Sequence, residues 1–194
     1  MTDLETVIHT TPLIDTHEHQ VSEAAYLKKK PDILQALFGF YTEHDLRTAG
    51  ASNEAIRQLM DPSNPDIAAR FRGVQDAWEA TAFTGYGEGV RLAAKTLYGI
   101  EEITPESLSD AAPLHQALLQ PGERLRLLRD IANLDHVQID DFVWECLPDP
   151  SGPEFFLYDI SWLSFAAGRI DLAAIERETV SLFGIWKLFA QQWK

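Results

Sequence analysis

Residues 12–19 read Pro12-Leu13-Ile14-Asp15-Thr16-His17-Glu18-His19 and decide our expectation for the fold. The stretch starts apolar and turns polar, as a buried parallel strand does where it ends. Because alternate side chains of a strand share a face, we expect Asp15, His17 and His19 on one face and Glu18 on the other. Two imidazoles on one face can hold one metal ion, whereas on a helix the same spacing separates them by about 200°. The stretch therefore predicts a strand that carries a metal site.

The two histidines are candidate ligands of a divalent metal ion. Imidazole nitrogens suit zinc and other late divalent ions, and a catalytic site uses ~3 protein ligands plus an open position for water. His17 and His19 thus leave the ligand set incomplete. Asp15 is a candidate supporting residue that orients an imidazole. The alternative is that both histidines are polar residues at a strand end and bind nothing.

A long helical excursion follows the first strand. A short helix is expected before Pro12, and almost everything between Ser22 and Asn133 has a helical pattern. Gly50 and Gly99 suit helix C-termini, and prolines mark the breaks. The expected helices are Glu23 to Leu46, Glu54 to Met60, Pro65 to Phe83, Glu88 to Tyr98 and Pro113 to Leu134. Helix starts are expected at Asn64-Pro65 and Thr104-Pro105. Breaks are expected at Pro31, Pro113 and Pro121-Gly122.

Strand patterns return after the helices. A β-branched and aromatic run from Val137 to Val143 predicts a second strand, which the proline-rich loop 148–153 closes. Phe155 to Ile160 is a third candidate strand, and Asp171 is expected to cap a helix from Leu172 to Thr179. The segment 180–194 is expected to form a helix with apolar side chains around much of its circumference. Three arrangements are open: the helix docks into this domain, joins a subunit interface or is exposed.

Composition limits the partners. The formal charge of -14 argues against nucleic acid and anionic lipid as partners. One cysteine, Cys146, rules out an internal disulfide and fits a reducing compartment. The acidic N-terminus does not resemble a secretory signal, and no apolar stretch reaches the ~20 residues of a membrane span. We expect a cytoplasmic protein with a small-molecule substrate.

The Asp-x-His-x-His pattern of Asp15, His17 and His19 resembles the opening strand of the amidohydrolase superfamily. The helical excursion looks like the branch with amidohydrolase-related proteins and uronate isomerase, where inserted helices cover the barrel mouth. The resemblance runs from about Thr11 to Thr179. It implies that His17 and His19 bind a divalent metal and that Asp15 supports them without being a ligand.

The resemblance also sets the expected fold, which is α/β. A complete barrel takes about 250 residues before insertions. We expect a single domain over 1–194, a partial TIM-like (β/α) barrel with a helical insertion at about 22–134 after strand 1. The family's later histidine and aspartate ligands have no positions here. The chain is therefore expected to be a truncated gene product, a fragment or a variant with a replaced C-terminal end.

The remaining histidines, carboxylates, glycines and aromatic residues are weaker candidates for a functional role than His17 and His19. His9, His44 and His115 are expected on the surface, and His136 at the strand end opposite the site. Asp140, Asp141, Glu145 and Asp159 are weaker candidates for contacts with substrate or metal. Gly85 to Gly89 is expected to form a turn between helices. Six aromatic residues are expected in the helical core: Phe38, Phe40, Tyr41, Trp78, Phe83 and Tyr86.

Two functional hypotheses remain. The first is a metal-dependent hydrolase of the amidohydrolase type, with uronate isomerase or decarboxylase chemistry as variants on the same scaffold. The second is a non-catalytic remnant or self-associating module, a homo-oligomer formed through the C-terminal segment 180–194. The sequence thus leaves enzyme activity undecided.

Overall fold

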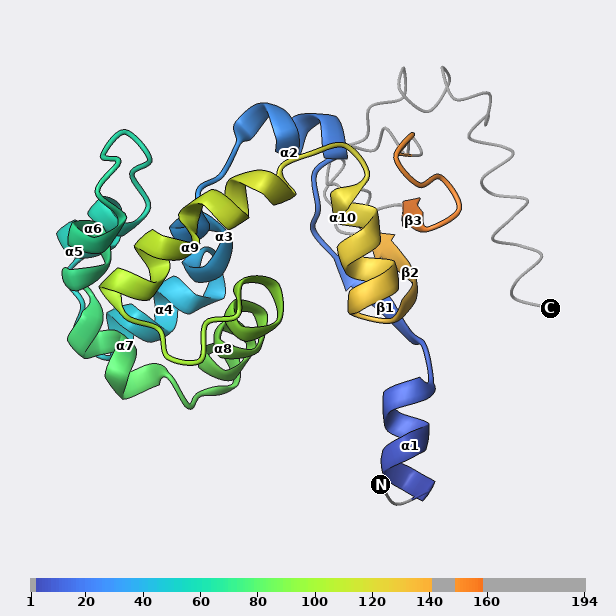
Figure 1. Ribbon diagram of the computed structural model, residues 1–194, viewed down its shortest axis with the longest axis horizontal. Helices are drawn as coiled ribbons and strands as arrows, with labels where there is room; N and C mark the ends of the chain where they lie inside the picture. Colours follow the sequence, from blue (N-terminus) through green and yellow to red (C-terminus); the bar gives the residue numbers. More distant parts are fainter. Residues whose placement is uncertain (1–2, 141–148, 159–194) are drawn as a thin grey trace, which may run out of the picture. The chain divides into compact units, whose positions relative to one another are not determined.

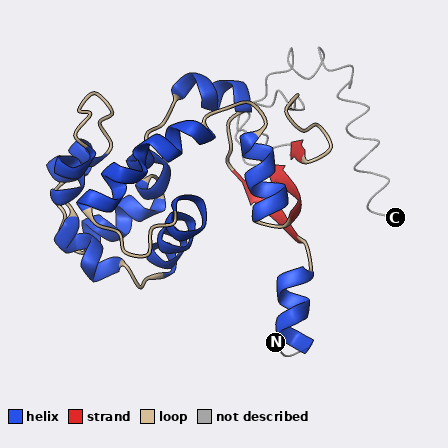
Figure 2. Ribbon diagram, in the orientation of Figure 1, coloured by secondary structure: helices blue, strands red, loops and turns tan. Residues whose placement is uncertain are grey.

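The computed structural model describes residues 3–140 and 149–158, which form helices and one small sheet (Figures 1 and 2). The chain divides into two compact units. We call Met1–Tyr26 with Pro121–Lys194 the sheet unit, and Leu27–Gln120 the helical unit. The helical unit corresponds most closely to the predicted insertion at 22–134.

The sheet unit is built on three parallel strands in the order β1-β2-β3. The predicted first strand is confirmed at Leu13–Glu18, and the second begins earlier than expected, at Leu134. The elements of this unit are α1 (Asp3–Thr10), β1 (Leu13–Glu18), α2 (Glu23–Lys29, which continues into the helical unit), α10 (Glu123–Arg126), the π-helical turn η1 (Leu127–Ile131), β2 (Leu134–Ile139) and β3 (Phe156–Tyr158).

One face of this sheet is covered by helix. Val137 and Ile139 of β2 pack with Phe155 and Phe156 into a small buried core. Leucines of α10 and η1, Leu125 and Leu128, lie against it. This is the packing that a helix leading into a parallel strand is expected to make.

The prediction of a partial TIM-like barrel is wrong. The described residues are mostly helical and hold only a small three-stranded parallel sheet, so a barrel is not indicated. A barrel alternates eight strands with eight helices. Here the segment between β1 and β2 is helical, and it forms a core separate from that of the sheet.

The helical unit has its own apolar core. Its largest fully buried side chains include Ile33, Leu34, Phe38, Leu46, Leu59, Phe71 and Leu108. Its helices are α3 (Ile33–Phe38), α4 (Tyr41–Thr48), α5 (Asn53–Leu59), α6 (Ile67–Arg72), α7 (Gln75–Thr81), α8 (Gly85–Tyr98) and α9 (Pro105–Leu118).

Several predicted helix ends are confirmed. Gly99 ends α8 with a left-handed φ of 70°, and Thr104 begins α9 in a capping box with Ser107. The predicted helix start at Asn64-Pro65 is wrong by two residues, because Asp66 caps α6 and the helix begins at Ile67.

Several predicted helix boundaries are wrong. The expected helix from Pro65 to Phe83 is two helices, α6 and α7. The expected helical stretch from Glu23 to Leu46 is three helices. The predicted break at Pro31 is confirmed next to Lys30, which has a φ of 47°, whereas the second break, at Phe40 with a φ of 58°, was not predicted. Gly85 to Gly89 is the first turn of α8 and not a turn before it. Pro113 lies inside α9, where buried residues on both sides, such as Ala111 and His115, hold the helix together despite the missing N–H.

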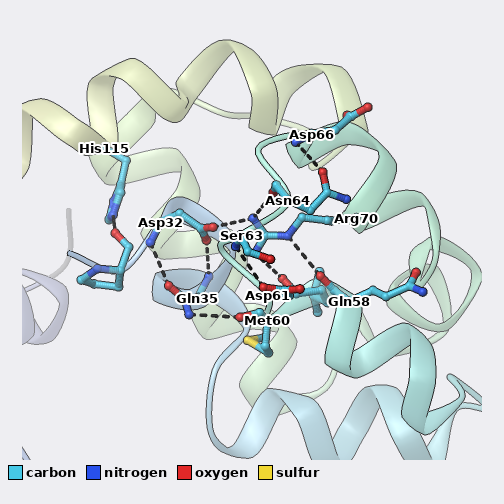
Figure 3. Close-up of polar contacts among 12 residues, drawn as sticks. Asp32, Gln35, Gln58, Met60, Asp61, Ser63, Asn64, Asp66, Arg70 and His115 are labelled. Atoms are coloured by element: carbon cyan, nitrogen blue, oxygen red, sulfur yellow. Dashed lines mark hydrogen bonds and ion pairs between the residues drawn. The ribbon is translucent and has the colours of Figure 1, made fainter. Parts of the chain in front are cut away.

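A buried arginine ties the helical unit together (Figure 3). The Arg70 guanidinium pairs with the Asp32 carboxylate at 2.5 Å and donates to backbone carbonyls that end or follow α5. Asp32 is also the N-cap of α3, in a capping box with Gln35. Gln35 in turn donates to the Met60 carbonyl. One buried cation therefore joins the start of α3, the end of α5 and helix α6.

Aromatic residues of the helical unit divide into two groups. Phe38 and Trp78 lie in the core, as predicted, with ring centroids 5.3 Å apart. The other four aromatic residues predicted for the core are exposed: Phe40, Tyr41, Phe83 and Tyr86. Among residues 3–140 and 149–158, no helix is both long enough and apolar enough to cross a membrane.

Candidate metal-binding site

The predicted metal ligands lie together at the end of β1. The His17 and His19 rings are 4.7 Å apart between centroids, in an edge-to-face arrangement at 83°. Both side chains are exposed, and Asp15 is half-buried. The structure thus brings the two predicted ligands side by side at a strand end.

The pairing of β1 with β2 is irregular between Asp15 and Glu18. Unbroken alternation along the strand is therefore not the reason why the His17 and His19 rings meet. Asp15 pairs with Val137, and Glu18 pairs with Ile139, so three residues of β1 span two of β2. Val137 and Ile139 share one face of β2, so strict alternation does not hold between Asp15 and Glu18. Irregularities of this kind re-aim side chains, and they are common beside functional sites. We expected Glu18 on the other face of β1 from Asp15 because side chains alternate along a regular strand. The irregular register removes the basis for that expectation.

The contact of His19 with the residue after β2 favours one neutral tautomer of its ring. His19 Nδ1 lies 3.0 Å from the backbone carbonyl oxygen of Asp140, which follows β2. A carbonyl oxygen only accepts, so Nδ1 of the neutral ring is the protonated nitrogen and Nε2 has the lone pair. A backbone carbonyl that orients an imidazole in this way is a frequent feature of metal-ligating histidines.

Carboxylates of the strand end hold the backbone around the histidines. Asp15 Oδ1 accepts the backbone N–H of His17 at 3.2 Å, and Glu18 Oε2 accepts that of His19 at 3.2 Å. The Asp140 N–H donates to the Glu18 carbonyl at 2.9 Å, which extends the β1–β2 ladder. Asp15 therefore supports His17 through the backbone. Its predicted role toward an imidazole stays a prediction.

Two nitrogen donors fit part of a metal site. Their chemistry suits a late divalent ion, and a catalytic zinc takes a third protein ligand. Within the part of the chain that the structure describes, no group of three or more His, Cys, Asp or Glu residues is placed to hold a metal ion. Asp141, Glu145, Cys146 and Asp159 lie outside the described residues. The described donor set is thus a pair.

The other histidines do not join this pair. His136 is the third residue of β2, and its Nδ1 lies 2.7 Å from the Asp135 carboxylate. His44 is exposed on α4, as predicted. Nothing in the described contacts brings either ring to the end of β1.

The prediction of a surface position for His115 is wrong, because the ring is buried in the helical unit (Figure 3). Its Nε2 lies 2.8 Å from the Pro31 carbonyl and its Nδ1 lies 2.8 Å from the Tyr98 hydroxyl. The carbonyl must accept, so the neutral ring donates through Nε2 and accepts the Tyr98 proton at Nδ1. Burial lowers the pKa of His115 below its ordinary value, although the Pro31 carbonyl and the Asp32 charge oppose this.

A buried ion pair that the sequence did not reveal anchors the chain just after His19. Arg124 pairs with Asp149 and donates to the Val21 carbonyl, and its guanidinium lies over the Phe156 ring. Asp149 also accepts the N–H of Glu23 at 2.8 Å. These bonds fix the path of the chain between the histidines and α2.

The carboxylate of this ion pair keeps its charge despite burial. Burial raises the pKa of Asp149, but bonds from Ser151 and Glu23 and the Arg124 charge outweigh it, so the pKa is below its ordinary value. No local pattern marks Arg124 or Asp149, because they lie in a helix start and a loop far apart in sequence. Only the folded chain reveals this contact.

Comparison of the chain with protein-family models, curated proteins and solved structures finds no match.

Proposed function

We propose that this chain binds a divalent metal ion of the zinc type through His17 and His19. We further propose that the site belongs to a metal-dependent hydrolase of the amidohydrolase type, which acts on a small-molecule substrate. The observation that carries the proposal is the pair of rings 4.7 Å apart at a strand end, one of them oriented by a backbone carbonyl. The resemblance of residues 12–19 to the amidohydrolase opening strand supports the choice of chemistry.

Each nearby group has a role in this proposal. His17 and His19 supply the ligating nitrogens, and the Asp140 carbonyl orients the His19 ring. The Asp15 carboxylate accepts the backbone N–H of His17, and the Glu18 carboxylate accepts that of His19. These bonds set the spacing of the two rings. A divalent ion bound there supplies a Lewis acid and lowers the pKa of bound water toward neutrality.

Metal content tests the binding proposal. The full chain is dialysed against Zn²⁺, freed of excess ion and analysed by mass spectrometry for zinc per chain. Mutating a residue that only hydrogen-bonds to a metal ligand already lowers metal affinity by about 10–100-fold. His17→Ala and His19→Ala each remove a ligand itself, so we expect each variant to lose at least that much affinity for zinc. His44→Ala is the control, because His44 is an exposed histidine of the helical unit, and it should keep the wild-type zinc content. Equal zinc in all four proteins contradicts the proposal.

A second candidate function is a metal-binding module without catalysis. It is favoured by the described donor set, which holds two imidazoles and no third ligand. The two candidates differ in one measurement, the hydrolysis of p-nitrophenyl acetate by zinc-loaded and chelator-treated protein. A metal-dependent rate that His19→Ala abolishes supports the hydrolase. Zinc binding without turnover supports the module.

A further inference from the structure

Residues 19–22 lead from β1 to α2 without regular secondary structure. The segment is fixed where it begins, because Glu18 ends β1 and its carbonyl accepts the N–H of Asp140. Further along, the Val21 side chain is 54% exposed, so packing does little to hold it. A hydrogen bond to the Val21 carbonyl is therefore important for the course of the backbone that leaves His19.

Arg124 of α10 donates to that carbonyl. Its guanidinium is also paired with Asp149, and its Cζ lies 4.4 Å from the Phe156 ring centroid. The Arg124 side chain is 13% exposed and that of Asp149 is 2% exposed, so water competes little for these bonds. The donor to Val21 is thus itself held by a buried charge and by a ring that begins β3.

The start of α2 is tied to the same place. Asp149 accepts the Glu23 N–H at 2.8 Å, and the Glu23 carboxylate accepts the Gly122 N–H at 2.9 Å. Gly122 directly precedes α10, so the helix that bears the arginine is bound to the chain at two points. His19 lies directly after β1 and two residues before Val21. Its backbone is therefore held between two fixed points, which leaves a short segment little conformational freedom.

Stability alone does not explain an arginine at position 124. Its Nε is buried and has no hydrogen-bond partner within the part of the chain that the structure describes. A buried polar group without a partner costs free energy, and apolar side chains of similar volume often replace a buried ion pair without loss of stability. The two bonds of the guanidinium that are made hold the chain after His19, so positioning accounts for this residue better than packing.

We propose that Arg124 is a positioning residue of the histidine pair. Through the Val21 carbonyl it keeps the backbone of His19 where the ring reaches the Asp140 carbonyl oxygen, 3.0 Å from Nδ1. A neutral ring held in this way has its proton on Nδ1, whereas a ring released from the carbonyl samples both tautomers. The effect on the ring is independent of metal. The expected effect on zinc affinity rests on the metal binding proposed above.

Nuclear magnetic resonance of the imidazole nitrogens tests the effect on the ring. Long-range ¹H–¹⁵N spectra of the full chain without metal are recorded at pH 8, and the His19 signals are identified by their loss in His19→Ala. We expect the proton of His19 on Nδ1 in the wild type and a mixture of tautomers in Arg124→Met, which keeps much of the side-chain volume but removes both bonds.

Zinc affinity is the second measurement, made by competition with a chromophoric chelator. Loss of a group that supports a metal ligand lowers affinity by about 10–100-fold, and Arg124 acts through the backbone rather than on the ring. We therefore expect the dissociation constant for zinc to rise by about tenfold in Arg124→Met, the lower limit of that range.

Two arginine variants are matched controls. Arg126→Met changes the same helix, but this side chain is 44% exposed and pairs with Glu123. Arg70→Met removes a buried ion pair from the helical unit, so it reports what lost stability alone does. Both variants should keep the wild-type His19 signals and zinc affinity. Arg124→Lys is the milder variant, because it keeps the cation but offers one nitrogen in place of two, and its effects should have the same direction.

Four results overturn the proposal. They are a folded Arg124→Met chain with wild-type His19 signals, an equal change in either control, a wild type with the His19 proton on Nε2, and, if Arg124→Met does not fold, wild-type signals in Arg124→Lys. The two proposals fail separately. A wild type that binds no zinc but shows the expected change of tautomer in Arg124→Met refutes the metal site and supports the positioning role of Arg124.

Discussion

Replacing Arg70 by methionine should strongly destabilise the helical unit. Methionine keeps much of the volume of the side chain but removes the charge that faces the Asp32 carboxylate. The Arg70 side chain is only 1% exposed, so water cannot replace the lost partner at its position. Three carbonyl groups also lose their donor: those of Gln58, Leu59 and Asn64.

The size of the effect follows from these contacts. Removing one partner of a buried ion pair costs about 3–5 kcal/mol. Asp32 keeps 17% exposure and the N–H of Gln35, which reduces its desolvation penalty. We therefore expect a loss near the lower limit, about 3 kcal/mol of the free energy of unfolding. Urea titration followed by far-ultraviolet circular dichroism measures it, since most of the described helix lies in this unit.

The same helix provides a matched control. Arg72 lies two residues further along α6 and pairs with Glu106, but its side chain is 55% exposed. An exposed pair of this kind contributes about 0–1 kcal/mol. Arg72→Met should thus cost less than about 1 kcal/mol. If Arg70→Met is as mild as Arg72→Met, the buried network does not hold the unit together as argued.

Two further changes probe the helical unit. The pKa of His115 is lowered in the folded chain, so the unfolded chain binds the proton first and stability falls as pH drops below about 6.5. His115→Gln should remove this part of the pH dependence in urea titrations between pH 8 and pH 5, whereas His44→Gln should not. A Cβ at Gly87 would lie 2.1 Å from the Thr81 carbonyl oxygen, so Gly87→Ala should cost about 1–3 kcal/mol. Gly89 lies in the same helix, and a Cβ added there would have no atom within 4 Å. Gly89→Ala should therefore stabilise the chain by up to about 1 kcal/mol. Equal effects of the two substitutions on the free energy of unfolding would refute the reasoning.

The local signals in the sequence predicted local structure well. The change from apolar to polar residues located β1, and Gly99 and Thr104 located helix ends, because each depends on the conformational preferences of a few neighbouring residues. The break at Pro31 was predicted, but the positive φ of Lys30 and the break at Phe40 were not. Both residues adopt left-handed backbone conformations that their side chains do not favour, so tertiary packing imposes them.

The candidate site was predicted in part. The spacing of His17 and His19 correctly suggested neighbouring rings at a strand end, but the register irregularity beside them depends on the pairing with β2. The buried positions of His115 and Arg70 could not be read from the sequence. Each is stabilised by partners distant along the chain, and a lone polar residue in a helical pattern is normally exposed.

The pairing of β1 with β2 has a consequence for the order of folding. Leu13 pairs with Leu134, so the first contact of the sheet closes a loop that contains the whole helical unit. Closing an unstructured loop of that length is entropically costly and slow, whereas helices form through local contacts in microseconds. The helical unit is therefore expected to fold first and shorten the loop. The strand that bears His17 and His19 would then acquire its partner late, at a rate set by residues far from the histidines.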